Sequence, residues 1–309
     1  MESILVLDTR IKFRHIQSFV EIVRQKSLKR ASEQLFVTQP AISKTLRELE
    51  EILGHPLLTR NRAGIALTPQ GEVFLHFAEM SLAALRQGIA GVEELGRQGS
   101  TSFTVGSLPS VAARLMPLVT EEFLERAPDV TLRIIDGPHG YLIDLLRRGH
   151  IDLVIGRLGA PDTMQNISFT QLYNEHLDFV VRPGHPLLAQ PDIRRIADWP
   201  VIFPPEGAAI RALAERVLIA HGVGALPRRL ETVSGAFGRR YVPNSDAVWI
   251  ISAGVVAKEI ADGQLARLPF DTAISNGPVG LMARPDETAP PAAQIFRLAV
   301  ASAVEQLGL

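Results

Sequence analysis

Polar and basic side chains recur at helical spacing near the start of the sequence, between Gln39 and Arg47. Together with Pro40, Ser43 and Lys44 they share one side of a helix, because residues three and four apart lie on the same face. A glutamine amide can bond the edge of an adenine, proline can contact a thymine methyl group, and cations bind phosphates. The pattern predicts a surface for double-stranded DNA, with Gln39 as the base-reading residue.

The residues around this face predict two short helices joined by a tight turn, over residues 27–53. Ser27 and Thr38 can cap these helices, since each hydroxyl accepts a backbone N–H that the helix leaves unbonded. The other side of the second helix is an apolar stripe of Ile42, Leu46, Leu49 and Leu53. Such a pair forms a helix-turn-helix motif. The alternative is an ordinary helical hairpin with a solvated face.

A predicted β-hairpin over residues 55–67 adds further cations after the helix stop at Gly54. Arg60 and Arg62 on this hairpin are candidates to bind a phosphate or to enter the minor groove, the alternative being solvated surface arginines. The complete predicted DNA-binding set is Ser27, Arg30, Thr38, Gln39, Pro40, Ser43, Lys44, Arg47, Arg60 and Arg62.

Charge is distributed unevenly over the 309 residues, although the formal net charge is only −1. Residues 10–47 carry 9 basic and 2 acidic side chains, whereas residues 72–309 carry 21 basic and 26 acidic ones. A basic head on an acidic body favours contact with DNA through one end of the molecule.

A second polar set is predicted where strands end in the C-terminal two thirds of the chain. From Phe103 onward strands and helices alternate, including a helix at 111–126 and strands at 151–156 and 229–233, which predicts an α/β domain with parallel sheets. Ligands of such domains bind at the carboxyl ends of the strands. Ser110 begins a helix whose N–H groups suit a carboxylate, and Arg157 can form two hydrogen bonds to one. The predicted effector-binding set is Ser107, Ser110, Pro138, His139, Arg157, Pro205, Gly207, Ser234 and Phe237.

Each of these candidates has a simpler structural explanation. Ser107 and Ser110 can be helix caps only, Arg157 can belong to a structural ion pair, and His139 can be a loop histidine. The histidines show no metal-ligand spacing, so we expect no metal site and no cofactor.

Composition and motifs narrow the class of protein. The chain has no cysteine, which excludes disulfides and thiolate chemistry. The apolar runs at 4–7 and 247–257 are too short for a signal peptide or a membrane span, so we expect a soluble, cytoplasmic protein. Phosphate-binding glycine loops, a nucleophile elbow and a His-Glu-x-x-His motif are all missing, so we expect no enzyme. A bifunctional DNA-binding enzyme is the alternative from another class.

A long helix is predicted from Pro69 to about Leu95, followed by a linker at 96–102. Its apolar stripe has no neighbouring helix in the local sequence to cover it, which predicts a dimer formed through this helix.

Four segments together resemble the signature of LysR-type transcriptional regulators: residues 31–43 (ASEQLFVTQPAIS), 49–54 (LEEILG), 56–60 (PLLTR) and 67–71 (LTPQG). The departures are mild, with Ser32 in place of a usual alanine and Ala63 where some members have a wing arginine. The resemblance implies a winged helix-turn-helix at 11–68, a linker and dimerisation helix at 69–97, and an effector-binding domain at 102–309. It implies that this last domain resembles type 2 periplasmic binding proteins, with lobe I at 102–163 and 270–309 and lobe II at 164–269.

The same resemblance implies partners. They are a second copy of the chain in dimers and tetramers, an interrupted inverted repeat in double-stranded DNA near a promoter, a small carboxylate effector, and RNA polymerase.

Further segments resemble a subgroup, the PcaQ-type activators of protocatechuate-degradation operons: residues 24–27, 71–75, 105–110, 155–158 and 245–252. This subgroup implies a response to an anionic intermediate of the β-ketoadipate pathway of aromatic-acid breakdown, such as a carboxylated muconate or muconolactone. Regulators of the galactose-binding protein share parts of these segments, so control of sugar or other metabolite uptake is the alternative. Whether the protein activates or represses is left open.

Overall fold

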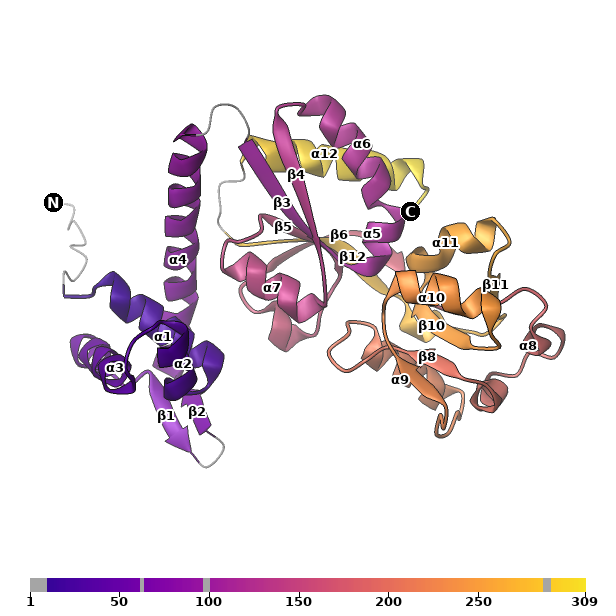
Figure 1. Ribbon diagram of the computed structural model, residues 1–309, viewed down its shortest axis with the longest axis horizontal. Helices are drawn as coiled ribbons and strands as arrows, with labels where there is room; N and C mark the ends of the chain where they lie inside the picture. Colours follow the sequence, from indigo (N-terminus) through magenta and orange to yellow (C-terminus); the bar gives the residue numbers. More distant parts are fainter. Residues whose placement is uncertain (1–9, 62–63, 97–100, 286–289) are drawn as a thin grey trace. The chain divides into compact units, whose positions relative to one another are not determined.

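The computed structural model describes residues 10–61, 64–96, 101–285 and 290–309, and it divides into two compact units (Figure 1). The N-terminal unit runs to Glu93 and includes residues 147–149, and the C-terminal unit holds the rest. Arg62, Ala63, the short run at 4–7 and most of the predicted linker lie outside the described residues.

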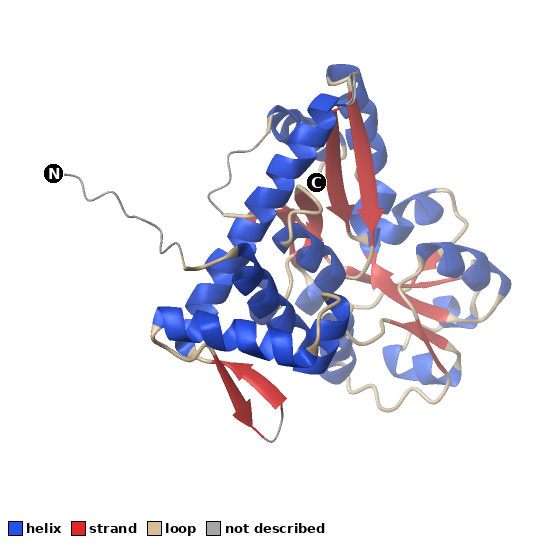
Figure 2. Cartoon of the chain, turned by 60° about the vertical axis from the view of Figure 1, so that its left-hand side comes forward, coloured by secondary structure: helices blue, strands red, loops and turns tan. Residues whose placement is uncertain are grey.

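The N-terminal unit has the winged helix-turn-helix arrangement that the sequence predicts. Its elements are α1 (Phe13–Gln25), α2 (Leu28–Gln34), α3 (Gln39–Leu53), β1 (Leu58–Asn61), β2 (Gly64–Leu67) and α4 (Pro69–Gly96). The predicted caps are present, because the Ser27 hydroxyl accepts from the Arg30 N–H and the Thr38 hydroxyl from the Ala41 N–H, each at 3.4 Å. Strands β1 and β2 pair antiparallel and project from the helices (Figure 2).

The three short helices enclose a small apolar core. Ile42 and Leu49 of α3 are almost completely buried, as their helical spacing predicts, and Phe19 of α1 packs beside Leu49. Burying one face of α3 in this way leaves its polar face in solvent.

Helix α4 carries apolar side chains that the rest of the unit does not cover. Val73, Phe77, Leu85 and Ile89 are each at least half exposed, while Leu82 is buried. This exposed stripe agrees with the expectation from the sequence.

The C-terminal unit contains two five-stranded sheets. Its strands are β3 (Thr101–Ser107), β4 (Val130–Asp136), β5 (Leu153–Arg157), β6 (Ser168–Glu175), β7 (Leu177–Val181), β8 (Val201–Phe203), β9 (Arg229–Glu231), β10 (Val248–Ser252), β11 (Ala266–Arg267) and β12 (Gly277–Ala283). Its α-helices are α5 (Pro109–Arg114), α6 (Met116–Arg126), α7 (His139–Arg147), α8 (Pro186–Ala189), α9 (Arg211–Ala220), α10 (Gly235–Tyr241), α11 (Ala253–Ala261) and α12 (Pro291–Gln306).

Helices cover both faces of the first sheet, whose strand order is β4-β3-β5-β12-β6. Successive side chains of a strand point to opposite faces. Accordingly, Leu153 and Ile155 of β5 join the core beneath α6 and α12, while Val154 joins the core beneath α7. All five residues of β5 are therefore buried.

Two details of topology differ from the sequence prediction. The sheets are mixed rather than parallel, because β12 runs antiparallel to β5 and β6, and β10 runs antiparallel to β7. Strand β6 pairs with β12, so residues 168–175 belong to the first sheet and not to the second lobe. The chain first enters the second sheet, ordered β11-β7-β10-β8-β9, at Leu177.

Local boundaries also differ. The helix predicted at 111–126 is divided into α5 and α6 at Leu115. The strand predicted at 229–233 ends at Glu231, and the short helix α10 begins only four residues later.

Candidate functional site

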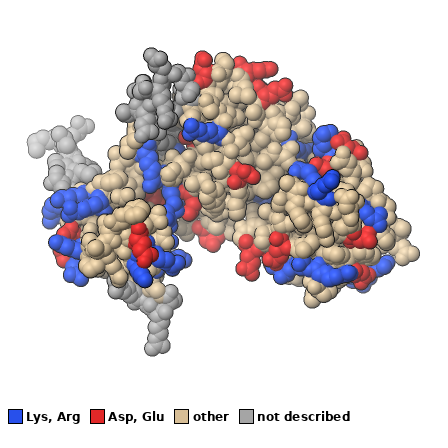
Figure 3. Space-filling view, in the orientation of Figure 1, with Lys and Arg blue, Asp and Glu red and all other residues tan. Residues whose placement is uncertain are grey.

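The predicted DNA-facing residues lie on the outer side of the helix-turn-helix. Gln39 and Pro40 form the first turn of α3 and are exposed, as are Lys44 and Arg47, while Ser43 is half-buried. Several groups of basic side chains lie on the visible face of this unit, together with a few acidic ones (Figure 3). The arrangement presents an amide, an apolar ring and two cations along one helix.

The remaining predicted DNA contacts have different positions. Arg30 is exposed on α2, whereas Ser27 and Thr38 already accept backbone N–H groups as caps. Arg60 belongs to β1, but its side chain is outside the described part of the structure, as is Arg62.

Glu48 joins the recognition helix α3 to α1. Its Oε2 atom lies 3.2 Å from both Arg14 Nη2 and His15 Nε2, and its Oε1 atom lies 3.8 Å from Lys44 Nζ. Because the Lys12 N–H points at His15 Nδ1, that nitrogen accepts and Nε2 carries the proton towards the carboxylate. Hydrogen bonds from His15 and Arg14 lower the pKa of the Glu48 carboxyl.

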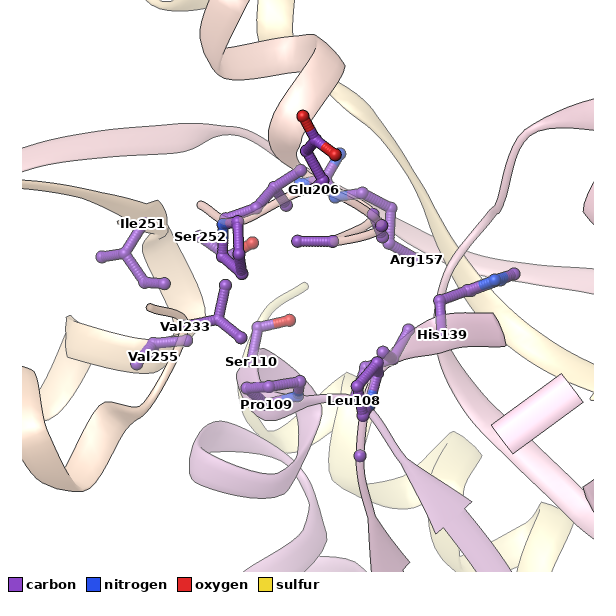
Figure 4. A pocket seen from close by; sticks show the side chains of 17 residues that line it. Leu108, Pro109, Ser110, His139, Arg157, Glu206, Val233, Ile251, Ser252 and Val255 are labelled. Atoms are coloured by element: carbon purple, nitrogen blue, oxygen red, sulfur yellow. The ribbon is translucent and has the colours of Figure 1, made fainter. Parts of the chain in front are cut away.

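Within the C-terminal unit, a cavity of about 140 Å³ lies among residues of both sheets (Figure 4). Most of its wall is apolar, and the polar side chains on it are few. The lining residues are Leu108, Pro109, Ser110, Gly137, Pro138, His139, Arg157, Pro205, Glu206, Gly207, Ala208, Ala209, Ile210, Val233, Ile251, Ser252 and Val255.

Six of the nine predicted effector contacts line this cavity: Ser110, Pro138, His139, Arg157, Pro205 and Gly207. The other three do not. Ser107 is completely buried, Ser234 caps α10 by accepting the Phe237 N–H, and Phe237 stacks on Tyr241. Val233, the residue before Ser234, lines the wall instead.

Arg157 is the cation of the cavity, and its side chain is only 4% exposed. Its Nη2 atom donates to the backbone oxygen of Glu175 at 2.8 Å and lies 3.6 Å from that residue's carboxylate. Its Nη1 atom donates to the backbone oxygen of Ser275 at 3.4 Å. Burial lowers the pKa of Arg157, while the Glu175 carboxylate acts in the opposite direction. Within the described part of the chain, Nε has no hydrogen-bond partner.

The sequence analysis did not find Glu175, which supports this arginine. One oxygen of its carboxylate accepts the Gly254 N–H at 3.0 Å, in the first turn of α11. A Cβ atom at Gly254 would lie 2.5 Å from this carboxylate oxygen and 3.1 Å from the Ser110 carbonyl oxygen, so a larger residue would displace the carboxylate. Glu175 is separated from Arg157 by a loop and a strand, so no local pattern reports the contact.

His139 and Ser252 show how the helices meet the cavity. Helix α7 begins at His139 and α11 begins directly after Ser252, so both helices present their N-terminal ends to it. The His139 ring points away from the centre in Figure 4 and lies against the Gly159 backbone. Ser110, in contrast, directs its hydroxyl inward (Figure 4).

The described residues contain no cluster of histidine, aspartate and glutamate arranged to hold a metal ion. None of the helices that the structure describes is long and apolar enough to cross a membrane.

Comparison with known proteins assigns both units. Residues 13–72 match the bacterial regulatory helix-turn-helix proteins of the lysR family, and residues 96–305 match the LysR substrate binding domain. Over 284 residues the chain is 48% identical to the HTH-type transcriptional regulator PcaQ of Agrobacterium fabrum, covering 91% of each chain. It is 33% identical over 289 residues to the uncharacterized regulator YdcI of Escherichia coli, covering 93% of this chain and 94% of that one.

A solved structure shows the same fold. Full-length LysG from Corynebacterium glutamicum is 18% identical, with a TM-score of 0.58 and coverage of 96% of this chain and 99% of that one. The families and relatives that match are transcriptional regulators and not enzymes. The chain therefore belongs to the LysR family: it is a DNA-binding transcriptional regulator with an effector-binding domain.

Proposed function

We propose that the protein controls an operon for aromatic-acid breakdown and binds a small carboxylate intermediate in the cavity of its C-terminal unit. The observation that carries this proposal is the buried Arg157 on a mostly apolar wall. A guanidinium can bond a carboxylate through two nitrogens. The identity of 48% to PcaQ supports the choice of pathway.

The size and lining of the cavity favour an acid with a compact carbon skeleton. Its volume of about 140 Å³ is similar to that of a cavity of about 150 Å³ that holds one benzene molecule. A sugar would bring a hydroxyl group on nearly every carbon, and each buried hydroxyl needs a partner. The wall offers few polar side chains to such a ligand, which favours an acid over a sugar; they are Ser110, His139, Arg157, Glu206 and Ser252.

Thermal unfolding of the full chain with candidate ligands tests this proposal. A ligand at about 100 times its Kd stabilises the folded form by about 2.7 kcal/mol, which raises the melting temperature. We expect this from carboxylated muconates or muconolactones, but not from their methyl esters or from galactose. A rise with galactose and none with the acids would contradict the proposal.

Glu206 offers a second arm of that experiment, because it is an exposed acid on the cavity wall. Glu206→Gln removes a like charge and should tighten binding of an anion. Glu121→Gln is the matched control, since Glu121 is exposed on α6 and does not line the cavity. Weaker binding in the Glu206 variant alone would speak against an anionic ligand.

For DNA, we propose that α3 reads bases through Gln39, Pro40, Ser43 and Lys44, with Arg30 and Arg47 on phosphates. The caps Ser27 and Thr38 and the hairpin residues Arg60 and Arg62 complete the proposed set. Gln39→Ala should cost about 1–3 kcal/mol on the correct site and flatten base preference at one or two positions. Arg30→Ala should weaken all duplexes alike and reduce the salt slope. Equal losses on specific and random duplexes for Gln39→Ala would remove the base-reading assignment.

We further propose that α4 pairs with α4 of a second copy, and that dimers form tetramers on an interrupted inverted repeat. The exposed stripe of Val73, Phe77, Leu85 and Ile89 supports the pairing, because exposed apolar side chains at helical spacing favour association. Phe77→Asp should shift the sedimentation coefficient towards that of a monomer, whereas Glu79→Asp on the same helix should not. A dimer that persists in the Phe77 variant would contradict this interface.

For an activator, RNA polymerase is the further partner that we propose. Because such a protein must reach the chromosome, we also propose that it works in the cytoplasm.

A further inference from the structure

Phe36, in the turn between α2 and α3, combines two unfavourable features. Its side chain is 95% exposed, although aromatic rings gain free energy by burial. Its backbone φ of +55° lies in the left-handed region, which disfavours bulky residues. Neither feature is needed to form the apolar cores of this unit, because the ring contacts neither of them.

The backbone around Phe36 explains why that conformation is required. The Val37 N–H donates to the Ser32 carbonyl at 3.0 Å, and the Phe36 N–H donates to the Glu33 carbonyl at 3.2 Å. These two hydrogen bonds form a Schellman motif at the end of α2, with Phe36 at the position that glycine or asparagine normally occupies. A glycine or asparagine would therefore suit the fold better than phenylalanine does.

The ring stands beside the proposed DNA-reading surface. Phe36 lies three residues before Gln39, the first residue of α3, and Val37 next to it is also exposed. Arg30 on α2 and Lys44 on α3 are exposed cations in the same motif, within a segment of 9 basic and 2 acidic residues. This charge is complementary to a nucleic acid and not to an ordinary protein surface.

We propose that Phe36 is a DNA contact, whose ring packs on an apolar surface of the duplex at the edge of the site that α3 reads. DNA offers two apolar surfaces for such a contact, the methyl group of thymine and the deoxyribose ring. Such a contact adds affinity without neutralising a phosphate, so it leaves the salt slope unchanged. The inference rests on the proposed use of α3 as the recognition helix.

Phe36→Asn in the full chain separates function from folding. Asparagine accepts the left-handed backbone, so the variant should melt at the same temperature as the wild type or higher. Its affinity for a duplex selected from a random pool by the wild-type protein should fall about tenfold, at unchanged salt slope. Phe36→Tyr should retain wild-type affinity, because it keeps the ring.

Controls distinguish the alternatives. Ile219→Ala removes another largely exposed apolar side chain, from α9, and should leave DNA affinity unchanged. Replacing thymine by uracil throughout the selected duplex should weaken wild-type binding more than that of Phe36→Asn if the ring contacts a methyl group, because both proteins keep Pro40. If the ring contacts deoxyribose, the change to uracil should alter the affinity of both proteins by the same factor.

Two results would overturn the inference. One is wild-type affinity in Phe36→Asn while Gln39→Ala loses base preference, which leaves the α3 surface intact and removes Phe36 from it. The other is a loss of affinity that accompanies dissociation of the oligomer in sedimentation, which assigns the ring to a second copy of the chain. If neither Phe36→Asn nor Gln39→Ala changes binding, the α3 surface itself is wrong.

Discussion

The two candidate sites are built in opposite ways. The DNA-binding candidates come mainly from one helix and the residue before it, and their side chains lie in solvent. The cavity is lined from segments that are scattered between Leu108 and Val255, and its cation is buried. A site on one helix can be altered one residue at a time, whereas a site between packed elements is part of the core that supports it.

The energetics should differ accordingly. Exposed cations interact through water, so a single substitution of one costs little stability. The effects of two such substitutions should be additive. A buried ion pair contributes little net stability when intact, but removal of one partner leaves an uncompensated charge. The following predictions test this contrast, beginning with the largest effect.

Arg157→Met should lower the free energy of unfolding of the C-terminal unit by about 3–5 kcal/mol, because it leaves the Glu175 carboxylate buried without its cation. The double variant with Glu175→Gln should recover most of that loss, since no charge is then stranded. Calorimetry of the full chain measures both. If the double variant instead lost as much stability as the two single variants together, Arg157 and Glu175 would not be coupled.

One glycine from each unit allows the tightness of packing inside the two units to be compared. Gly238→Ala should cost about 1–3 kcal/mol of stability, because the new Cβ would lie 2.4 Å from the Trp249 ring in the core. Gly54→Ala, at a left-handed helix end with open space around it, should cost only about 1 kcal/mol. Denaturant unfolding measures both variants. A larger loss of stability in Gly54→Ala than in Gly238→Ala would contradict the expected difference between the units.

Arg30→Ala and Arg47→Ala should each reduce the salt slope of DNA binding by about 1 and should combine additively. Both residues are exposed, so the melting temperature should hardly change. Titrations of the single and double variants at several salt concentrations provide the measurement. A double variant no weaker than either single one would mean that the two arginines share one phosphate.

Glu48→Gln should have the smallest effect, and a pH-dependent one. Because the folded-state pKa of Glu48 lies below its ordinary value of 4.5, the carboxylate stabilises the fold above that pH and loses this contribution as the pH falls through the lowered pKa. The variant should melt slightly earlier than the wild type at neutral pH, and the difference should vanish once the pH falls below the lowered pKa of Glu48. Glu51→Gln, exposed on the same helix, is the control. A difference that persists at low pH would point to packing instead of charge.

The same contrast explains which parts of the molecule the sequence could predict. Helix α3, its cap and its buried stripe follow from spacing within 15 residues, because the physical cause is local. Strand β6 could not be placed, since only His176 separates it from β7, yet its pairing partner β12 lies about a hundred residues onward. Strand order in a mixed sheet depends on such distant contacts.

Individual residues show the limit more sharply. The sequence places Arg157 at a strand end, but its contacts with Glu175 and Ser275 span 18 and 118 residues. Ser234 was misplaced because the strand before it stops early. Phe36 gave no signal, because exposure of an aromatic residue appears only when the helices around it have packed.

Arg157 touches both segments by which the chain passes between the two sheets. The Glu175 carbonyl that it bonds lies on the outward crossing, and the Ser275 carbonyl lies on the return crossing. The Ser275 hydroxyl in turn accepts the N–H of Leu177, which ties the two crossings together. Both crossings are therefore held by Arg157, whose side chain also lines the cavity. An occupant of the cavity that bonds this guanidinium would therefore bond the side chain that holds both crossings, which would couple the ligand to the connection between the two sheets.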